Sequence, residues 1–176
     1  MSDYDSLIQG KRVTVQRHGF EPDAFKAPLF DFQKIAVRFA LRQGRAALFQ
    51  ECGMGKTIQQ LEWARQVEDH TCKPVLILAP LAVAAQTIAE GKHFGIEVKQ
   101  VREIEDIGAR GIYVTNYDRI DKLEDAFAEL GGVVLDESSI LMNFMGRTRI
   151  RLSELCARVP FRLCCTATPA PNDWSE

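Results

Sequence analysis

A glycine-rich segment, Gly53-Met54-Gly55-Lys56-Thr57, lies between a short apolar run and a helix-like run. Glycines let the backbone turn tightly and present N–H groups to phosphate oxygens, and the N-terminus of the following helix adds partial positive charge. Lys56 can then reach the β- and γ-phosphates of a nucleotide, and the Thr57 hydroxyl can coordinate Mg²⁺. The common phosphate-loop pattern has glycine where this chain has Gln50, so the match is incomplete. The strand before and the helix after nevertheless favour a nucleotide site over a plain glycine turn.

A pair of acidic residues, Asp136-Glu137, directly follows the apolar run 133–135. A carboxylate at the end of a strand can hold Mg²⁺, directly or through water, and its neighbour can orient or deprotonate an attacking water. Alone the pair is a weak signal, because loops are rich in acids and Ser138 or Ser139 could serve as a helix cap. Combined with the phosphate loop, it supplies the complementary half of an Mg-nucleotide site.

The hydrophobic pattern predicts the elements that must position these groups. Helical stripes of apolar residues recur over 32–40, 56–67, 81–88, 123–130 and 152–159. Short apolar strands are expected at 46–49, 75–79, 96–101, 112–115, 133–135 and 161–165. Buried strands that alternate with amphipathic helices predict an α/β fold, with a mainly parallel sheet covered by helices on both faces. Ligands of such sheets bind beyond the carboxyl ends of the strands, where the polar segments collect.

Length and composition limit the remaining choices. A chain of 176 residues suits a single domain, with 1–28 as a poorly readable N-terminal extension and 29–176 as the domain proper. The net charge of −2 gives no global attraction to nucleic acid, so any such contact must be local. No apolar run approaches ~18 residues, so no membrane association is expected. An odd number of cysteines with no C-x-x-C pair, and an acidic, polar N-terminus, favour a reduced, cytoplasmic protein without a secretory signal.

The motifs and their order resemble the first RecA-like motor domain of superfamily-two helicases and translocases, most closely the Swi/Snf-type branch and its phage and bacterial relatives. Leu29-Phe30-Asp31-Phe32-Gln33 is similar to the adenine-reading motif L-x-x-[YF]-Q, and Glu51–Thr57 resembles the loop D-E-M-G-L-G-K-T, which also lacks the first glycine. Asp136-Glu137-Ser138-Ser139 takes the place of D-E-A-H. Thr166-Ala167-Thr168-Pro169, with Asn172, resembles motif III. The similarity covers roughly residues 29–173 and implies a RecA-like P-loop fold.

The resemblance implies a role for each matched residue, with ATP and Mg²⁺ as cofactors. The implied nucleotide-binding residues are Phe32, Gln33, Gly53, Met54, Gly55, Lys56 and Thr57. Lys56, Asp136 and Glu137 would be catalytic, with Thr57 and Asp136 holding Mg²⁺ and Glu137 positioning the attacking water. Thr166, Ala167 and Thr168 would couple the nucleotide state to domain movement. Because Ser138-Ser139 departs from the family pattern, the coupling contacts made from that position are not implied by the resemblance.

The resemblance also implies partners. Residues after the second and third strands would face nucleic acid, with DNA favoured over RNA; the candidates are Pro80, Gln86, Asn116 and Tyr117. The basic stretch Arg147, Arg149 and Arg151 could contact phosphates, but a solvated helix face is the favoured interpretation. Relatives place ATP between two motor domains, and the chain ends at Glu176, just after the motif III match. We therefore expect a second RecA-like domain as partner and weak or no turnover by this chain alone, since a missing arginine finger costs ~10³–10⁵ in rate.

Two other functions share the phosphate loop. A P-loop small-molecule kinase would need an acceptor site and a lid, and it leaves 29–33 and the motif III segment unexplained. A non-catalytic module that docks on nucleotide, DNA or a partner needs the same fold, so the site residues do not separate it from the motor. The sequence thus favours an ATP hydrolase of the helicase or translocase type, with both alternatives open.

Overall fold

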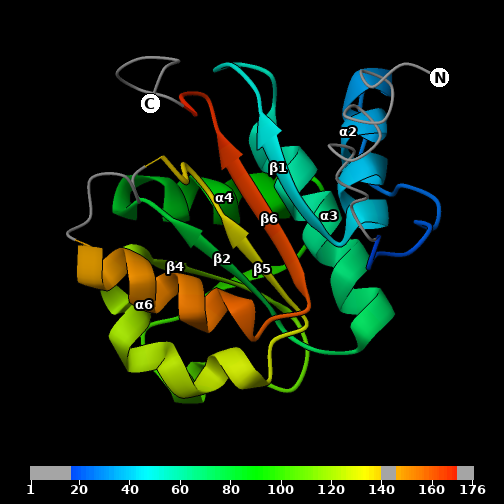
Figure 1. The fold of residues 1–176 in the computed structure, drawn as a ribbon. Helices are drawn as coiled ribbons and strands as arrows, with labels where there is room; N and C mark the ends of the chain where they lie inside the picture. Colours follow the sequence, from blue (N-terminus) through cyan, green and yellow to red (C-terminus); the bar gives the residue numbers. More distant parts are fainter. Residues whose placement is uncertain (1–16, 140–145, 170–176) are drawn as a thin grey trace, which may run out of the picture.

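The computed structural model describes residues 17–139 and 146–169, and these fold around one six-stranded sheet (Figure 1). The strands are β1 (Arg45–Phe49), β2 (Val75–Ala79), β3 (Val98–Gln100), β4 (Ile112–Asn116), β5 (Gly132–Leu135) and β6 (Phe161–Thr166). They lie in the order β1-β6-β5-β2-β4-β3, and every neighbouring pair is parallel. The predicted parallel α/β fold is therefore confirmed.

Helices cover both faces of the sheet, because the central strands alternate apolar side chains between two cores. The helices are α2 (Asp31–Gln43), α3 (Lys56–Thr71), α4 (Leu81–His93), α6 (Gly146–Ala157) and the 3₁₀ segments η1 (Ile104–Asp106) and η2 (Tyr117–Ala128). On β2, Val75 and Ile77 pack in the cluster that includes α2, α3 and α4. Leu76 and Leu78 of the same strand pack in the cluster that includes η2 and α6.

Two predicted elements differ from the structure. The helix expected at 123–130 is the 3₁₀ segment η2, which begins at Tyr117. Its buried residues Tyr117, Ile120, Leu123 and Ala126 recur every three positions, which matches the three-residue turn of a 3₁₀ helix. The strand expected at 96–101 is limited to β3, since the Ile96 N–H bonds to the Gly91 carbonyl and closes the turn after α4.

The parallel arrangement brings the carboxyl ends of the strands to one edge, which lies at the top of Figure 1. Because β6 lies between β1 and β5, the segment after β6 separates the phosphate-loop candidate from the acidic pair. Phe49 at the end of β1 is in register with Thr166, and Ala79 at the end of β2 is in register with Asn116.

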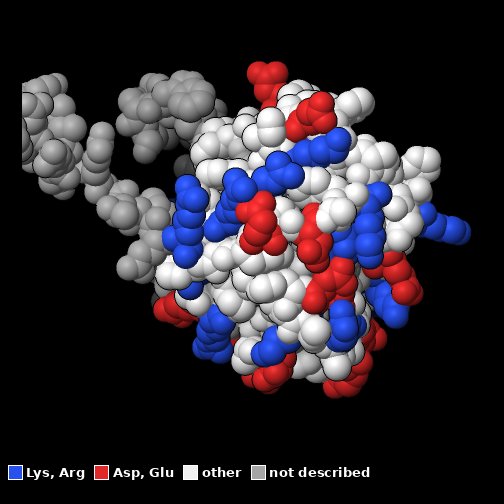
Figure 2. Space-filling model, turned by 90° about the vertical axis from the view of Figure 1, so that its right-hand side faces the viewer, with Lys and Arg blue, Asp and Glu red and all other residues white. Residues whose placement is uncertain are grey.

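The described part of the expected N-terminal extension packs onto the helices on one side of the sheet. The N–H groups of His18 and Phe20 bond to carbonyls near the end of α2, and Ala27 is buried in the core. On the face shown in Figure 2, basic and acidic side chains are interspersed. Arg42 of α2, for example, pairs with Glu21 at 2.6 Å. Across the described residues, no helix is both long and apolar enough to cross a membrane.

Candidate active site

The loop between β1 and α3 has the backbone conformation that its glycines allow. Gly53 and Gly55 have φ values of 83° and 69°, and Gly55 is the N-terminal cap of α3. The left-handed conformation favours glycine here, and a Cβ added at Gly55 would lie 2.5 Å from Nε2 of Gln33, so a larger residue would displace the Gln33 amide. The loop therefore brings exposed backbone to the N-terminus of a long helix, as a phosphate site needs.

Lys56 folds over this loop. Its ammonium donates hydrogen bonds to the carbonyl oxygens of Gln50, at 3.1 Å, and Glu51, at 3.2 Å. Carbonyl partners orient the ammonium without neutralising it, so its charge stays available to an anionic ligand. Thr57 follows in the first turn of α3 and is partly exposed, with a hydroxyl at the same helix end.

The side chains of Gln50 and Gln59 support the loop, and sequence reasoning did not identify Gln59 as a site residue. The side-chain amides of Gln50 and Gln59 bond reciprocally at 2.9 Å. Gln59 also donates to the carbonyls of Met54, at 3.1 Å, and Gly55, at 3.2 Å. Gln50 stands where the common pattern has glycine, and here its amide becomes part of the support. The only signal in the sequence is the pair Gln59-Gln60 in the helix that follows the loop.

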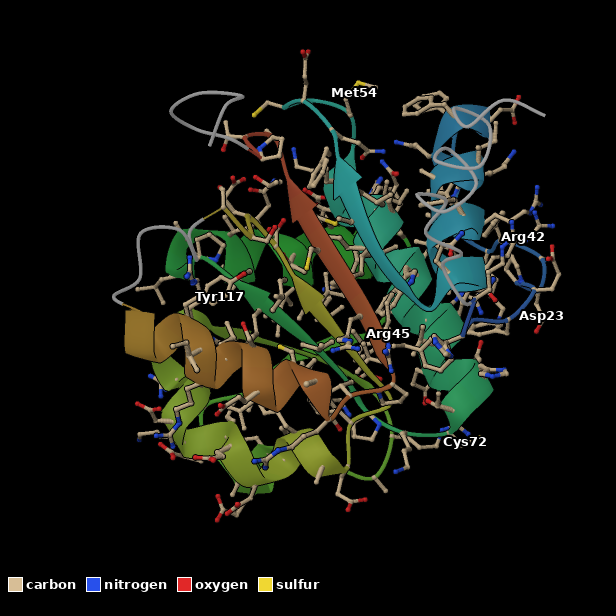
Figure 3. All side chains as sticks on the ribbon, viewed as in Figure 1. Asp23, Arg42, Arg45, Met54, Cys72 and Tyr117 are labelled. Atoms are coloured by element: carbon tan, nitrogen blue, oxygen red, sulfur yellow. The ribbon has the colours of Figure 1, made fainter. Side chains whose placement is uncertain are left out.

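Gln33 connects the start of α2 to the same loop. It is buried, its Oε1 accepts the Phe30 N–H at 2.9 Å, and its Nε2 donates to the Met54 carbonyl at 3.0 Å. The rings of Phe30 and Phe32 are exposed and nearly parallel, with centroids 6.2 Å apart. Figure 3 shows Met54 at the top of the loop, beside the start of α2. The residues expected to read adenine therefore adjoin the residues expected to bind phosphate.

The Asp136 side chain enters the site from the end of β5. Its N–H bonds to the Leu78 carbonyl at 2.8 Å, and its own carbonyl accepts the Tyr117 hydroxyl at 2.7 Å. Gln60 of α3 donates to the Asp136 carboxylate at 2.6 Å. Burial raises the pKa of Asp136, and the Gln60 hydrogen bond and the charge of Lys56 act in the opposite direction. Gln60 is a further site residue that sequence reasoning missed.

Glu137 connects the acidic pair to the segment after β6. Its backbone is left-handed, with φ at 50°, and its Oε1 accepts hydroxyl hydrogen bonds from Ser139 at 2.7 Å and Thr166 at 2.9 Å. The Thr168 N–H donates to Thr166 Oγ1 at 3.0 Å, and the Thr168 hydroxyl donates to Ser139 Oγ at 3.2 Å. Ala167 lies between these two threonines and contributes no polar side-chain atom. The structure thus assigns contacts to Ser139, the position that departs from the family pattern.

The residues expected to face nucleic acid have different environments. Pro80 is the N-terminal cap of α4, and Asn116 ends β4 beside it, with its Oδ1 buried and without a hydrogen-bond partner in the structure. Gln86 is exposed and donates to Glu90 at 2.8 Å. Tyr117 is only 5% exposed, so its side chain does not form a surface contact as expected. The cause is the three-residue period of η2, which turns Tyr117 into the core.

The basic stretch is described only in part. Arg149 is exposed, and Arg151 forms ion pairs with Glu124 and Asp121 of η2, as a solvated helix face does. The side chain of Arg147, and Asn172 of the motif III match, lie outside the described residues.

The oxygen donors of the site suit Mg²⁺. Thr57 offers a hydroxyl and Asp136 a carboxylate, and Mg²⁺ is usually held by one or two such oxygens together with substrate phosphates and waters. The charge of Lys56 acts on the Asp136 carboxylate. The loop and the acidic pair are therefore close enough to contact the same ligand. The residues present therefore fit a bound Mg-nucleotide.

Comparisons with known proteins agree with this geometry. No protein-family model matches the sequence. The chain is 40% identical over 62 residues to the DNA annealing helicase and endonuclease ZRANB3 of Bos taurus, a match that covers 35% of this chain and 6% of that protein. The structure is similar to the Sulfolobus solfataricus SWI2/SNF2 ATPase core in complex with dsDNA, with a TM-score of 0.71, 22% identity, and coverage of 89% of this chain and 36% of that chain.

A second structural relative is the UvsW helicase from bacteriophage T4, with a TM-score of 0.66, 14% identity, and coverage of 94% of this chain and 59% of that chain. The chain spans less than two thirds of the length of each of these proteins. At these identities the structural likeness bears on the fold, and it confirms the resemblance suggested by the motifs. The chain therefore has a RecA-like α/β fold, similar to that of the SWI2/SNF2 ATPase core and of the UvsW helicase.

Proposed function

We propose that this domain is the ATP-binding half of a nucleic-acid-dependent ATPase motor, a helicase or DNA translocase that hydrolyses ATP when a second RecA-like domain joins it. The observation that carries the proposal is the convergence of three segments at one sheet edge. The loop after β1, the acidic pair after β5 and the threonines after β6 come from neighbouring strands, although they are far apart in sequence. Each segment supplies a different group that phosphoryl transfer needs.

In this proposal the loop N–H groups and Lys56 bind the phosphates of ATP, and Gln33 reads the adenine edge with Phe32 beside it. Thr57 and Asp136 hold Mg²⁺, which when bound neutralises charge on the phosphate oxygens. Glu137 orients the attacking water and accepts its proton. Thr166 and Thr168 connect that carboxylate to the end of β6, and movement of a second domain would act through them.

Nucleic acid is the proposed polymer along which the motor moves. DNA is favoured because two of the structural relatives were solved in complex with DNA or a DNA mimic. The SWI2/SNF2 core was solved with dsDNA, and a restriction-modification enzyme of similar fold, LlaGI, was solved with a DNA substrate mimic. Pro80, Asn116 and Gln86 remain the proposed contacts on this chain. Pro80 and Asn116 lie at the same edge of the sheet, where the N-terminus of α4 can approach a phosphate.

Calorimetric titration of the chain with Mg-ATP, with and without duplex DNA, tests the proposal. We expect the wild-type chain to bind and Lys56→Ala to lose binding, whereas Lys34→Ala, a change at an exposed lysine of α2, serves as the matched control. Unchanged affinity in Lys56→Ala would contradict the phosphate-loop assignment. Transfer of phosphate to a metabolite would favour a small-molecule kinase, and partner binding that survives Lys56→Ala would favour a docking module.

A further inference from the structure

Helix α3 buries four polar side chains, which together hold three other segments of the chain. Gln59 supports the phosphate loop, while Glu62 and Gln66 bond to backbone groups of residues 23–27. The fourth, Gln60, is the one that reaches the acidic pair. A buried amide is retained at little cost only where its hydrogen bonds are made. The burial of the Gln60 amide is therefore explained by its bond to Asp136 rather than by contacts within α3.

The Gln60 side chain contacts the acidic pair and a core residue of β6. Its side chain is 1% exposed, and its Nε2 donates to Oδ1 of Asp136 at 2.6 Å. An ionised carboxylate only accepts, which fixes the amide with its N–H toward Asp136. The buried Cys165 thiol adjoins the same amide from β6, so the amide is confined on two sides. Its Oε1 is buried without a hydrogen-bond partner in the structure.

The backbone of Asp136 is fixed separately from its side chain. Its N–H bonds to Leu78 of β2, and its carbonyl accepts the hydroxyl of Tyr117 of η2. These contacts set where the residue lies but not how its carboxylate is turned. Of the described side chains, Gln60 is the one that hydrogen-bonds to the carboxylate. The Glu137 N–H is a backbone donor to the same carboxylate. Orientation of the carboxylate thus depends on its chain neighbour and on α3, the helix that also begins with Lys56 and Thr57.

We propose that Gln60 is a positioning residue for the magnesium site: its amide holds one oxygen of Asp136 and thereby directs the other toward the metal of a bound Mg-nucleotide. The inference rests on the proposed function of the site. A neutral amide suits this role, because a lysine or arginine partner would orient the carboxylate but also reduce the negative charge that attracts Mg²⁺. Partners that orient a metal ligand typically change metal affinity by ~10–100-fold when they are removed.

The first test measures the contact without any nucleotide. Urea unfolding of the wild-type chain, Gln60→Met, Asp136→Ala and the double variant forms a double-mutant cycle. Methionine keeps the length of glutamine and removes both polar groups. We expect the two changes to be coupled by about tenfold in the unfolding equilibrium constant, the scale of a hydrogen bond to a charged group. Additive effects would overturn the proposal.

The second test measures the consequence for the metal. ATP affinity is determined by calorimetry in EDTA and in excess Mg²⁺. We expect Gln60→Met to lower the affinity for Mg-ATP by about tenfold while the affinity in EDTA is unchanged. Gln60→Glu, which has no N–H and brings a second negative charge, lowers Mg-ATP affinity further. Gln66→Met is the matched control, since Gln66 is a buried glutamine of the same helix that bonds to Asp23 instead.

The outcomes separate the two proposals. Equal losses in EDTA and in Mg²⁺ would mean that Gln60 acts on the fold or the loop, and would overturn its role at the metal. A folded wild-type chain that binds no ATP in either buffer would contradict the proposed function. The unfolding cycle would then decide alone whether Gln60 holds Asp136.

Discussion

The hydroxyl of Thr166, at the end of β6, donates a hydrogen bond to the carboxylate of Glu137, with 2.9 Å between Oγ1 and Oε1. The same Oε1 accepts the Ser139 hydroxyl at 2.7 Å. Two hydroxyls from different segments therefore fix the orientation of the residue proposed to position water. Because β6 and β5 are adjacent, a shift of the segment after β6 would reorient this carboxylate.

Removal of the Thr166 hydroxyl tests that relationship. In a protein containing both motor domains, we expect Thr166→Val to retain Mg-ATP affinity and lower kcat, because the carboxylate loses one of its two donors. Glu137→Gln should retain binding and lower kcat by ~10²–10⁴, the range for loss of a general base. Steady-state hydrolysis and calorimetry measure the two effects. Thr87→Val is the control, since the buried Thr87 bonds only within α4; equal turnover in all variants would refute the assignment of Glu137.

Gln33→Ala tests base selection. The change removes the amide that would read adenine and also its bond to the Met54 carbonyl. We expect affinity for ATP to fall roughly two- to tenfold, the scale of a neutral hydrogen bond, and the preference for ATP over GTP to shrink. Competition binding with both nucleotides measures it, with Gln43→Ala at the other end of α2 as control. Equal affinity of the wild-type chain for ATP and GTP would contradict the adenine-reading role.

Cys52 provides a chemical probe of the loop. It is exposed within the phosphate-loop segment, and Cys72 is an equally free thiol at the opposite end of α3 (Figure 3). We expect Mg-ATP to slow alkylation of Cys52, because the nucleotide covers the loop, and to leave Cys72 unaffected. Mass spectrometry after timed labelling measures both sites in one sample. Equal rates at Cys52 with and without Mg-ATP would place the nucleotide elsewhere.

Glu62 tests how the segment before α2 is held. Its fully buried carboxylate accepts the Ala27 N–H at 3.2 Å and pairs with Arg65 at 2.6 Å. We expect Glu62→Ala to reduce the free energy of unfolding by about 3–5 kcal/mol, because buried donors lose their acceptor. Urea denaturation measures it. Glu129→Ala, which removes an exposed partner of Lys73, should lower the free energy of unfolding by at most about 1 kcal/mol. Similar losses in both variants would show that the buried contacts of Glu62 stabilise the fold no more than an exposed ion pair does.

The buried thiol of Cys156 should make the protein less stable at high pH. Burial raises the pKa of Cys156 to about 12, from an ordinary value of 9.0. Above pH 9 the unfolded chain therefore releases a proton that the folded chain retains, so the free energy of unfolding falls as pH rises. Urea unfolding between pH 8 and pH 11 of the wild-type chain and Cys156→Ala isolates the effect. The difference between them should shift by up to about 1.4 kcal/mol per pH unit above 9, and a constant difference would contradict the shift.

The sequence predicted which segments form strands and helices, and how they alternate along the chain, because apolar periodicity records which side of each element is buried. It predicted that a glycine-containing loop connects a strand to a helix, as β1 and α3 are connected. It also predicted that polar segments meet at the carboxyl edge of the sheet, since such a segment follows each apolar strand. These are local properties, read within a window of a few residues.

The tertiary structure alone decided which segments meet. The position of β6 between β1 and β5 brings Thr166 to Glu137, and strand order depends on packing between distant elements rather than on the pattern within one strand. The contacts of Gln59 and Gln60 likewise join helix α3 to the loop and to β5. Tyr117 is buried because its 3₁₀ segment turns it into the core, although its place after a strand suggested the surface. Side-chain hydrogen bonds between remote segments leave no periodic signal in a sequence, because they need only one residue at each end.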